Sequence, residues 1–260
     1  MDFTGKAILI TGAAGAIGRG LARRFRELGG MVFLTDLDQG SLDDVCRELA
    51  GLPGDCQALA GDVTEHNDVR RVVAAAVEAF GGRIDVLVNV AGTVGQGGHV
   101  EEITPENWDR VFAVNCKGTF LFLKEVVPVM KKTGGSVVNF SSKSGKTGSA
   151  LMSHYSAAKA AIIGLTQALA HELAGDGIRV NCVCPGITAD TGVWSNVSRD
   201  YVENLGLPID EVVGRFTAKV PLGRLASVRD VVAVTVFLTS DAAAYMTGQA
   251  INVTGGREMH

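Results

Sequence analysis

Three side chains in the middle of the chain have the types and the spacing for proton transfer: Ser142, Tyr155 and Lys159. Tyr155 and Lys159 stand four residues apart, and residues four apart share one face of a helix. A nearby ammonium favours the phenolate and lowers the pKa of a tyrosine from its usual value of about 10. Tyr155 would then exchange a proton near neutral pH, while Ser142 could hydrogen-bond the same substrate oxygen. The alternative is an ordinary surface pair on a helix, so the interpretation depends on the rest of the chain.

A glycine-rich turn near the N-terminus has the form of a phosphate-binding loop. The string GAAGAIG occupies residues 12–18, between the apolar run Lys6–Thr11 and an amphipathic stretch that ends at about Gly30. This order predicts a strand, a tight turn and a helix. Backbone N–H groups at the start of such a helix can bind a pyrophosphate, so the sequence predicts a dinucleotide site.

Further candidate cofactor residues follow the ends of the next apolar runs. Asp36 closes the run MVFLTD, and a carboxylate there is placed for the adenosine ribose hydroxyls and repels a 2′-phosphate. We therefore expect NAD rather than NADP; the alternative is that Asp36 is a turn residue. Asp62 and Val63 end a third run, and NVAG at 89–92 ends a fourth. Ligands bind beyond the carboxyl ends of parallel strands, where these turns should lie.

Apolar and amphipathic runs alternate along the whole chain. The expected strands are 6–11, 31–36, 56–62, 84–89, 135–142, 178–186 and 249–253. The expected helices begin after the glycine turn and continue at 41–51, 65–80, 104–132, 153–175 and 227–239. Strands that alternate with helices predict a parallel sheet covered on both faces. We expect one α/β domain over residues 1–260, a Rossmann fold with a doubly wound parallel sheet of about seven strands.

Residues 187–226 interrupt this alternation with a long excursion between a strand and a helix. A connection of this length in a compact domain is usually functional. We expect a substrate lid with short helices of its own, in which Trp194 and Phe216 supply apolar cover.

Composition excludes several classes of protein. The chain has 260 residues, of which 47% are apolar, a net charge of −4 and a pI near 5.7. It has no basic tail or stripe, so we expect no nucleic-acid partner. No apolar run approaches the roughly 18 residues that a membrane span needs. Five cysteines without a CxxC pair predict free thiols, and the N-terminus lacks the pattern of a secretion signal, so we expect a cytoplasmic protein that holds no metal.

Together these segments resemble the short-chain dehydrogenase/reductase family over essentially the whole chain. The matching segments are TGAAGAIG at 11–18, Asp36, Asp62, NVAG at 89–92, Asn115, Ser142, YSAAK at 155–159 and PG at 185–186. The resemblance implies that Tyr155 is the acid/base and that Ser142 holds the substrate oxygen. It implies that Lys159 lowers the tyrosine pKa and binds the nicotinamide ribose. Asn115 would complete this tetrad by holding a water in the proton relay; its alternative role is a capped or kinked site in a long helix.

The resemblance also implies a cofactor site, a strand order and an assembly. The implied NAD-binding residues are Gly12, Gly15, Ile17, Gly18, Asp36, Leu37, Asp62, Val63, Asn89, Ala91, Gly92, Tyr155, Lys159, Pro185, Gly186 and Thr188. One departure is Ala16, where family members usually have a glycine; here Gly15 stands one step earlier. The implied strand order is 3-2-1-4-5-6-7. The implied homotetramer packs through the helices at 105–132 and 153–175 and through the C-terminal strand.

Part of the second half has a narrower resemblance. The strings SKSGKTGS, GLTQALA, VPLGR and YMTGQAINVTGG are similar to those of bacterial sorbitol-6-phosphate 2-dehydrogenases, which oxidise sorbitol 6-phosphate with NAD. Acetoin and free-polyol dehydrogenases share VPLGR and TGQ. The expected function is NAD-dependent interconversion of a secondary alcohol and a ketone, on a sugar alcohol or its phosphate. The alternatives are a carbonyl reductase of the acetoin or 3-ketoacyl type and, from another class, a non-catalytic dinucleotide sensor.

Candidate substrate residues lie on and near the loop that contains Ser142. Lys143 and Lys146 could present ammonium groups to a phosphate on the substrate, and Trp194 could cover it. The alternative for both lysines is that they are solvated on a surface loop.

Overall fold

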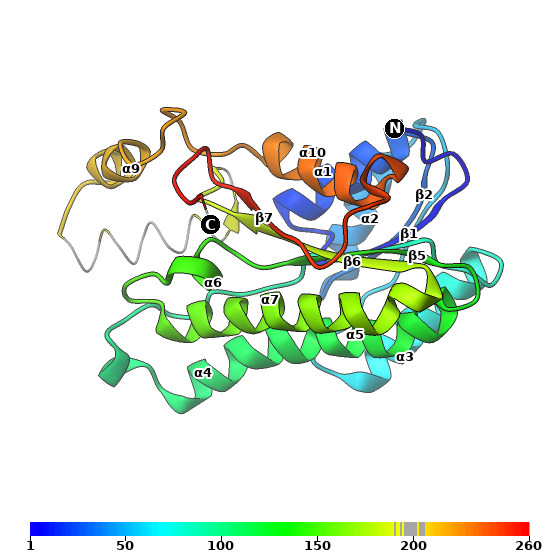
Figure 1. Ribbon diagram of the computed structural model, residues 1–260, viewed down its shortest axis with the longest axis horizontal. Helices are drawn as coiled ribbons and strands as arrows, with labels where there is room; N and C mark the ends of the chain where they lie inside the picture. The colour runs from blue at the N-terminus through cyan, green and yellow to red at the C-terminus, as the bar shows by residue number, and fades with distance from the viewer. Residues whose placement is uncertain (190, 193, 195–201, 203–205, 260) are drawn as a thin grey trace.

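The computed structural model describes residues 1–189, 191, 192, 194, 202 and 206–259. Its centre is a sheet of seven parallel strands in the order β3-β2-β1-β4-β5-β6-β7, which confirms the predicted fold class and strand order (Figure 1). The strands are β1 (Ala7–Thr11), β2 (Met31–Thr35), β3 (Cys56–Ala58), β4 (Val86–Asn89), β5 (Gly135–Phe140), β6 (Ile178–Pro185) and β7 (Ala250–Val253). The chain runs outward from β1 to β3 and then returns to β4, so the order reverses between β1 and β4. Such a reversal is where this type of sheet binds ligands.

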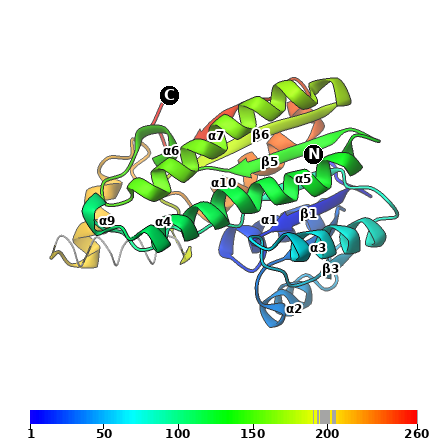
Figure 2. The ribbon, with the colours of Figure 1, turned by 90° about the horizontal axis from the view of Figure 1, so that it is seen from below.

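Helices cover both faces of the sheet. One face carries α1 (Ala16–Glu27), α2 (Gln39–Glu48) and α10 (Val228–Thr239), as Figure 1 shows. The other face carries α3 (His66–Ala79), α5 (Gly118–Met130) and α7 (Ser153–Leu173), which Figure 2 shows from their own side. Successive strand residues therefore face different apolar layers: Ile8 and Ile10 pack beneath α1, and Leu9 packs beneath α3 and α5. This two-sided burial explains why the strands are apolar without alternation.

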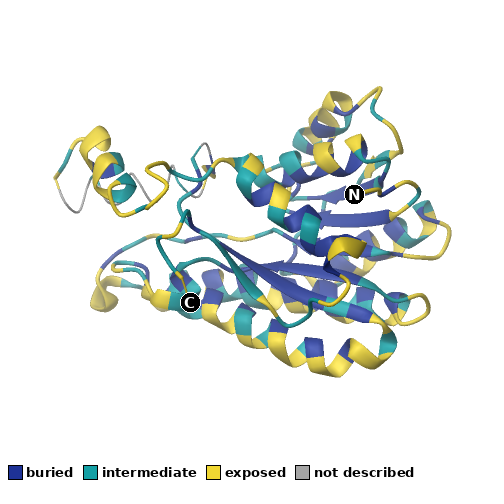
Figure 3. Ribbon diagram, turned by 45° about the horizontal axis from the view of Figure 1, so that its top comes forward, coloured by how far each residue is buried: buried dark blue, intermediate teal, exposed yellow. Residues whose placement is uncertain are grey.

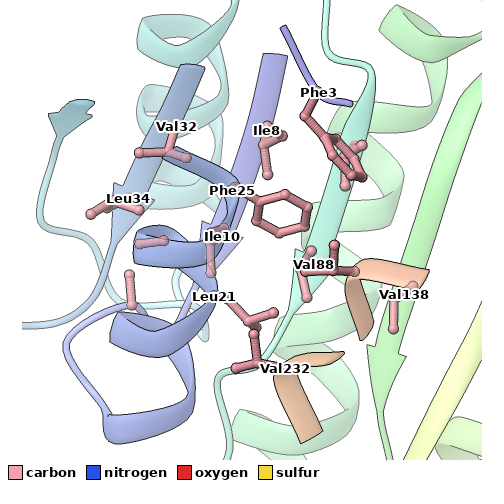
Figure 4. Packing of buried hydrophobic residues seen from close by; sticks show 14 of the residues in the cluster. Phe3, Ile8, Ile10, Leu21, Phe25, Val32, Leu34, Val88, Val138 and Val232 are labelled. Atoms are coloured by element: carbon pink, nitrogen blue, oxygen red, sulfur yellow. The ribbon is translucent and has the colours of Figure 1, made fainter. Parts of the chain in front are cut away.

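The core on the first face is tightly filled around one aromatic pair. Phe25 of α1 is fully buried, and its ring meets Phe3 edge-on with centroids 5.0 Å apart (Figure 4). Leu21 of α1 and Val232 of α10 lie in the same cluster. Figure 3 shows the inner strands buried and the outer faces of the helices exposed, and the edge strands β3 and β7 are only partly buried. The sheet thus gives the loops at its carboxyl edge a rigid support.

Two helix starts illustrate how capping residues set the boundaries. Ser227 caps α10, with its hydroxyl accepting from Asp230 N while the Asp230 carboxylate accepts from Ser227 N. The second helix begins earlier than the sequence predicted. Asp38 is the N-cap of α2, and its carboxylate accepts a hydrogen bond of 2.7 Å from Ser41 N.

The helix expected over 104–132 is present and contains a π-helical turn. Pro105 does open a helix, α4 (Pro105–Phe112), with Thr104 as its cap. A π-helical turn at Ala113–Lys117 then separates α4 from α5. A π-helical turn adds one residue to the helix without ending it, so the apolar pattern continues on both sides.

Among the described residues, the connections also contain α6 (Ser144–Thr147) after β5 and α9 (Ile209–Thr217) within the excursion at 187–226. In the part of the chain that the structure describes, no helix is long and apolar enough to cross a membrane. The same residues contain no group of three His, Cys, Asp or Glu side chains that could hold a metal. All five cysteines are free thiols.

Candidate active site

A cavity of about 1170 Å³ opens at the carboxyl edge of the sheet. The turns that follow β1, β2, β4, β5 and β6 line it, together with α7 and α9. One end contains Gly12 and Asp36, and we call it the glycine-loop end. The other contains Ser142, Tyr155 and Lys159, and we call it the tyrosine end. Every candidate site residue from the sequence lines this cavity except Asn89 and Lys146.

The glycine loop is shaped by two close backbone approaches. Gly12 has a φ of +64°, and a Cβ there would lie 2.7 Å from Ala91 N at the end of β4. A Cβ on Gly18 would overlap the carbonyl oxygen of Gly12 and lie 2.6 Å from Ala13 Cα. Gly15 is the N-cap of α1 and has an extended backbone (φ −73°, ψ 162°). The shift of the middle glycine to position 15 therefore leaves the loop intact, and Ala16 begins the helix.

The N-terminus of α1 is suited to an anion. It has no side-chain cap and no acidic residue in its first turn. The first N–H groups of a helix have no partner within the helix and carry a partial positive charge. These groups border the cavity through Ala16, Ile17 and Gly18. A pyrophosphate fits this cradle, because glycine lets its oxygens approach the backbone.

Asp36 is positioned by the glycine loop itself. Its carboxylate accepts hydrogen bonds from Ala14 N (2.9 Å) and Leu37 N (2.8 Å), and it lines the cavity just beyond β2. A carboxylate here can accept further hydrogen bonds from ribose hydroxyls at the adenosine part of a dinucleotide. Asp62 forms a turn, since its Oδ1 accepts from the backbone and the hydroxyl of Thr64 at 2.8 Å each. Asp62 and Val63 also line this end.

Asn89 does not line the cavity, so its assignment as a cofactor residue needs correction. The side chain is 3% exposed, and its Nδ2 donates to Asn139 Oδ1 on the neighbouring strand at 3.0 Å. Asn139 in turn donates to Thr166 of α7 at 3.1 Å. Asn89 ends β4 with its side chain directed between strands, so it belongs to a buried polar link, while the cavity wall here consists of Val90, Ala91 and Gly92.

Asn115 lies in the π-helical turn between α4 and α5. Its amide nitrogen donates to the carbonyls of Thr93 (2.7 Å) and Val111 (2.8 Å), while its buried Oδ1 has no hydrogen-bond partner among the described residues. An added Cβ on Gly92 would lie 2.7 Å from this Oδ1 and 3.2 Å from Lys159 Nζ. Asn115 and Lys159 therefore converge on the space beside Gly92. A buried amide oxygen without a partner fits a donor from a bound water or ligand.

Tyr155 and Lys159 share one face of α7 and line the cavity, as their spacing predicted. Ser142 hydrogen-bonds the phenol, and its hydroxyl accepts from Ser144 N at 3.1 Å. The Lys159 ammonium donates to the carbonyl of Phe140 at 2.9 Å and lies 5.7 Å from the centre of the Tyr155 ring. The structure thus brings the four tetrad candidates to the tyrosine end of the cavity.

The electrostatics of Tyr155 differ from the expectation. Burial raises the pKa of its phenol to about 12, and the hydrogen bond with Ser142 opposes this shift. Burial also lowers the pKa of the Lys159 ammonium to about 8. Desolvation of the phenolate decides the direction of the tyrosine shift, and the Lys159 ammonium donates to the Phe140 carbonyl. The predicted lowering of the tyrosine pKa by Lys159 is therefore wrong for this arrangement, and the phenol is protonated at neutral pH.

The two candidate substrate lysines have different surroundings. Lys143 lines the cavity directly after Ser142. Lys146 does not line it, because the turn of α6 directs its side chain toward the sheet, where Nζ donates to the carbonyl of Ala250 at 2.7 Å. We therefore correct the substrate assignment of Lys146. Trp194 does line the cavity and meets Phe216 edge-on, with ring centroids 6.0 Å apart.

Sequence reasoning missed several cationic residues of the tyrosine end. Arg215 and Lys219 lie on and just after α9, and Arg257 follows β7; all three line the cavity. A usable signal for Arg257 was its position four residues after a predicted parallel strand, beyond two glycines. Such strands all end at the same edge of the sheet. No comparable periodic signal marked the residues of the excursion.

The lid stays a prediction, because the excursion at 187–226 lies partly outside the described residues. Within its described part, Thr188 and the nearby Thr191 line the cavity. The Thr191 hydroxyl donates to the Thr188 carbonyl at 2.9 Å. α9 contributes Val212 and Phe216 to the cavity wall.

The arrangement fits a nicotinamide dinucleotide on three observations. The α1 N-terminus offers unpaired N–H groups, Asp36 stands at the far end of the same cavity, and Asn115 Oδ1 needs a donor near Lys159. Neighbouring backbone atoms lie so close to Gly12 and Gly18 that neither position has room for a side chain. These features define an oxidoreductase with a Rossmann fold.

The chain belongs to the short-chain dehydrogenase/reductase family. A family model described as enoyl-(acyl carrier protein) reductase matches residues 12–258. The 3-oxoacyl-[acyl-carrier-protein] reductase of Thermotoga maritima is 38% identical over 257 residues, 98% of this chain and 99% of that protein. The sorbitol dehydrogenase of Cereibacter sphaeroides is 36% identical over 261 residues and the full length of both chains. The chain is therefore an oxidoreductase that acts on CH–OH groups.

Solved structures agree on the fold and include both forms of the cofactor. NAD⁺-bound xylitol dehydrogenase has a TM-score of 0.94 at 30% identity, over 98% of this chain and 100% of that one. Sorbitol-6-phosphate 2-dehydrogenase from Erwinia amylovora has a TM-score of 0.92 at 33% identity, over 97% and 100%. A variant of actinorhodin polyketide ketoreductase with NADPH has a TM-score of 0.92 at 34% identity, over 100% of both chains. The fold thus binds a nicotinamide dinucleotide.

Proposed function

We propose that the protein interconverts a secondary alcohol and a ketone with NAD as its cofactor, on a sugar alcohol or sugar-alcohol phosphate. The observation that carries this proposal is the shared cavity, which has Asp36 at one end and Ser142, Tyr155 and Lys159 at the other. Relatives named as polyol dehydrogenases support the substrate class. The sensor alternative is not supported, because relatives and solved structures that match the chain are named as reductases and dehydrogenases.

The roles of the side chains follow from their positions. When bound, NAD⁺ supplies the hydride acceptor. Ser142 and Tyr155 hydrogen-bond the substrate hydroxyl and orient the carbinol carbon toward the cofactor. In oxidation, the phenolate of Tyr155 accepts the hydroxyl proton as the carbonyl forms, and in the reverse direction the phenol gives its proton to the carbonyl oxygen. Lys159 holds a positive charge beside the phenolate that forms, and Asn115 offers its free Oδ1 to a water that relays the proton.

A carbonyl reductase of the 3-ketoacyl type is the second candidate. Its support is the ketoacyl reductase relative and the NADPH-bound ketoreductase structure. A turnover assay separates the candidates: we expect NAD⁺ reduction with polyols or their phosphates, and little NADPH oxidation with acetoin or 3-ketoacyl thioesters. Faster turnover of a ketoacyl thioester with NADPH than of any polyol with NAD⁺ would reject the proposal.

The cofactor preference should depend on Asp36. Replacing Asp36 with alanine removes an acceptor for the ribose hydroxyls and the repulsion of a 2′-phosphate, so we expect weaker NAD binding by about tenfold and improved use of NADP. Asp36→Asn should remove the repulsion of the 2′-phosphate with less disturbance of the glycine loop, because an amide oxygen can still accept the hydrogen bond from Ala14 N. Measured kcat/KM for both cofactors tests this.

The matched control for that experiment is Asp43→Ala, on the exposed surface of α2. It should leave the ratio of NAD to NADP efficiency unchanged. Equal efficiency with both cofactors in the unaltered protein would contradict the assignment.

We also propose the homotetramer that the family resemblance implies. Its support is exposed aromatic surface on the helices beside the cavity: Phe120 of α5 is 50% exposed, and Trp108 of α4 is 41% exposed and stacked on Phe112. Exposed apolar area of this kind on one face is typical of subunit interfaces.

A further inference from the structure

Three cationic side chains from separate segments gather at the tyrosine end of the cavity. Lys143 follows β5, Lys219 follows α9 and Arg257 follows β7, and all three line the cavity wall. Two carboxylates occur among the described lining residues, Asp36 and Asp62, and both belong to the glycine-loop end. The sheet order separates the ends, because β2 and β3 lie on one side of β1 while β5 and β7 lie on the other.

The chain holds Arg257 in this position through its C-terminal tail. Leu222 N donates to Gly255 O at 3.1 Å, which joins the tail to the segment after α9. The carbonyl of Glu258 accepts from Asn252 Nδ2 and Thr254 Oγ1, each at 3.1 Å. The Arg257 guanidinium lies 5.5 Å from the centre of the Phe216 ring. These contacts fix the tail between β7 and α9 with its guanidinium at the cavity.

The cluster has an excess of positive charge. Arg257 is offset by Glu258, whose carboxylate lies 3.5 Å from its Nε, whereas no carboxylate forms an ion pair with Lys143 or Lys219 within the described ranges. Among the described residues, the only hydrogen bond of Lys143 Nζ is a long one of 3.4 Å to the Gly148 carbonyl. Burial, followed by repulsion from Arg257, lowers the pKa of the Lys143 ammonium. Cations held together in a half-buried wall repel one another unless an anion joins them.

We propose that Lys143, Lys219 and Arg257 bind a phosphate monoester on the substrate. This inference rests on the proposed function, since it assigns the substrate class of the same cavity. With Arg257 partly offset by Glu258, the cluster presents about two net positive charges, which matches a phosphate monoester near neutral pH better than a carboxylate. Arginine supplies a planar fork of donors and the lysines supply mobile point charges. Because Lys143 follows Ser142 directly, a phosphate on the cluster places the carbinol of the same molecule within reach of Ser142 and Tyr155.

A binding experiment tests the cluster without turnover. Inorganic phosphate is titrated into the protein saturated with NAD⁺, so that the pyrophosphate site at the glycine loop is filled, and the affinity is measured by calorimetry. Lys219→Gln and Arg257→Gln should each weaken phosphate binding about tenfold or more, as the loss of a charged hydrogen bond predicts. Phosphate that fails to bind, or that binds both variants as it binds the unaltered protein, overturns the proposal. Acetate that binds more tightly than phosphate overturns it in favour of a carboxylate substrate.

Lys143 and Lys146 provide a matched pair for the same titration. They lie three residues apart on one loop, but Lys146 Nζ donates to Ala250 O outside the cavity. Lys143→Gln should weaken phosphate binding, and Lys146→Gln should leave it unchanged. A larger loss for Lys146→Gln than for Lys143→Gln would contradict the assignment.

A kinetic experiment distinguishes failure of this inference from failure of the proposed function. The ratio of kcat/KM for a phosphorylated polyol to that for the free polyol, such as sorbitol 6-phosphate and sorbitol, should exceed one and fall about tenfold or more in Lys219→Gln and Arg257→Gln. A higher kcat/KM for the free polyol overturns the phosphate site but keeps the proposed function. Variant-sensitive phosphate binding without oxidation of any polyol keeps the site and rejects the proposed function.

Discussion

Replacing Tyr155 with phenylalanine should lower kcat by about a hundredfold to ten-thousandfold, the usual contribution of a positioned acid/base. The ring that packs against Val94 and Met152 is retained, so the fold should be unchanged. NAD binding should also persist, because the glycine loop and Asp36 lie at the other end of the cavity. Steady-state kinetics and a fluorescence titration with NADH measure both quantities.

The pH profile sharpens this test. Because burial raises the pKa of Tyr155 to about 12, the phenol is protonated at neutral pH, and alcohol oxidation, which needs the phenolate, should accelerate as the pH rises. The residual rate of Tyr155→Phe should lack this dependence on the tyrosine. Tyr245→Phe is the control, since Tyr245 is fully exposed and should keep the original profile. A decrease below tenfold in the Tyr155 variant would mean that the proton takes another route.

Gly18→Ala should weaken NAD binding by about tenfold to a hundredfold, the range that overpacking by one methyl group produces. The new Cβ would meet the backbone of Gly12 and Ala13, which cannot rotate away as a side chain can. Relief of this overlap displaces the loop that borders the pyrophosphate position. The dissociation constant for NADH measures the effect, and the melting temperature reports how much of the strain reaches the fold.

Gly214→Ala in α9 is the matched control for that substitution. Nothing lies within 4 Å of a Cβ at Gly214, and alanine favours a helix by up to about 1 kcal/mol over glycine. It should leave NAD affinity unchanged and the melting temperature equal or higher. Unchanged NAD affinity in Gly18→Ala would show that the loop tolerates a side chain and would contradict the packing described for it.

Much of the fold was predictable because its signals are local. The apolar runs at Ala7–Thr11 and Met31–Thr35 are buried on both faces, so each reads as a strand without knowledge of its neighbours. The Tyr155–Lys159 spacing predicted a shared helical face, and the glycines at 12 and 18 predicted a close backbone approach. The strand order was implied only by the family resemblance, because the pairing of strands that are distant in the sequence produces no periodic pattern of residues.

The errors occurred where a side chain's direction depends on contacts distant in sequence. Lys146 lies only a few positions after Lys143, yet its ammonium donates a hydrogen bond to the carbonyl of Ala250 in β7. Asn89 ends a strand in a motif that matches a cofactor site, yet its amide nitrogen donates a hydrogen bond to Asn139 of β5. In both cases a partner at least fifty positions away in the sequence decided the direction of the side chain.

The sequence by itself determined the sheet-and-helix alternation, the glycine loop, the acidic end of β2 and the Ser–Tyr–Lys set, because each depends on residue type and short spacing. Only the tertiary structure decided the sign of the pKa shift of Tyr155, since burial depends on every element packed around the phenol. It also decided the cation cluster, because Arg257 meets Lys143 only after β5 and β7 join the same sheet and the tail docks beside α9. Parallel strands end at one edge whatever their distance in the chain, and that geometry assembles residues which no local pattern connects.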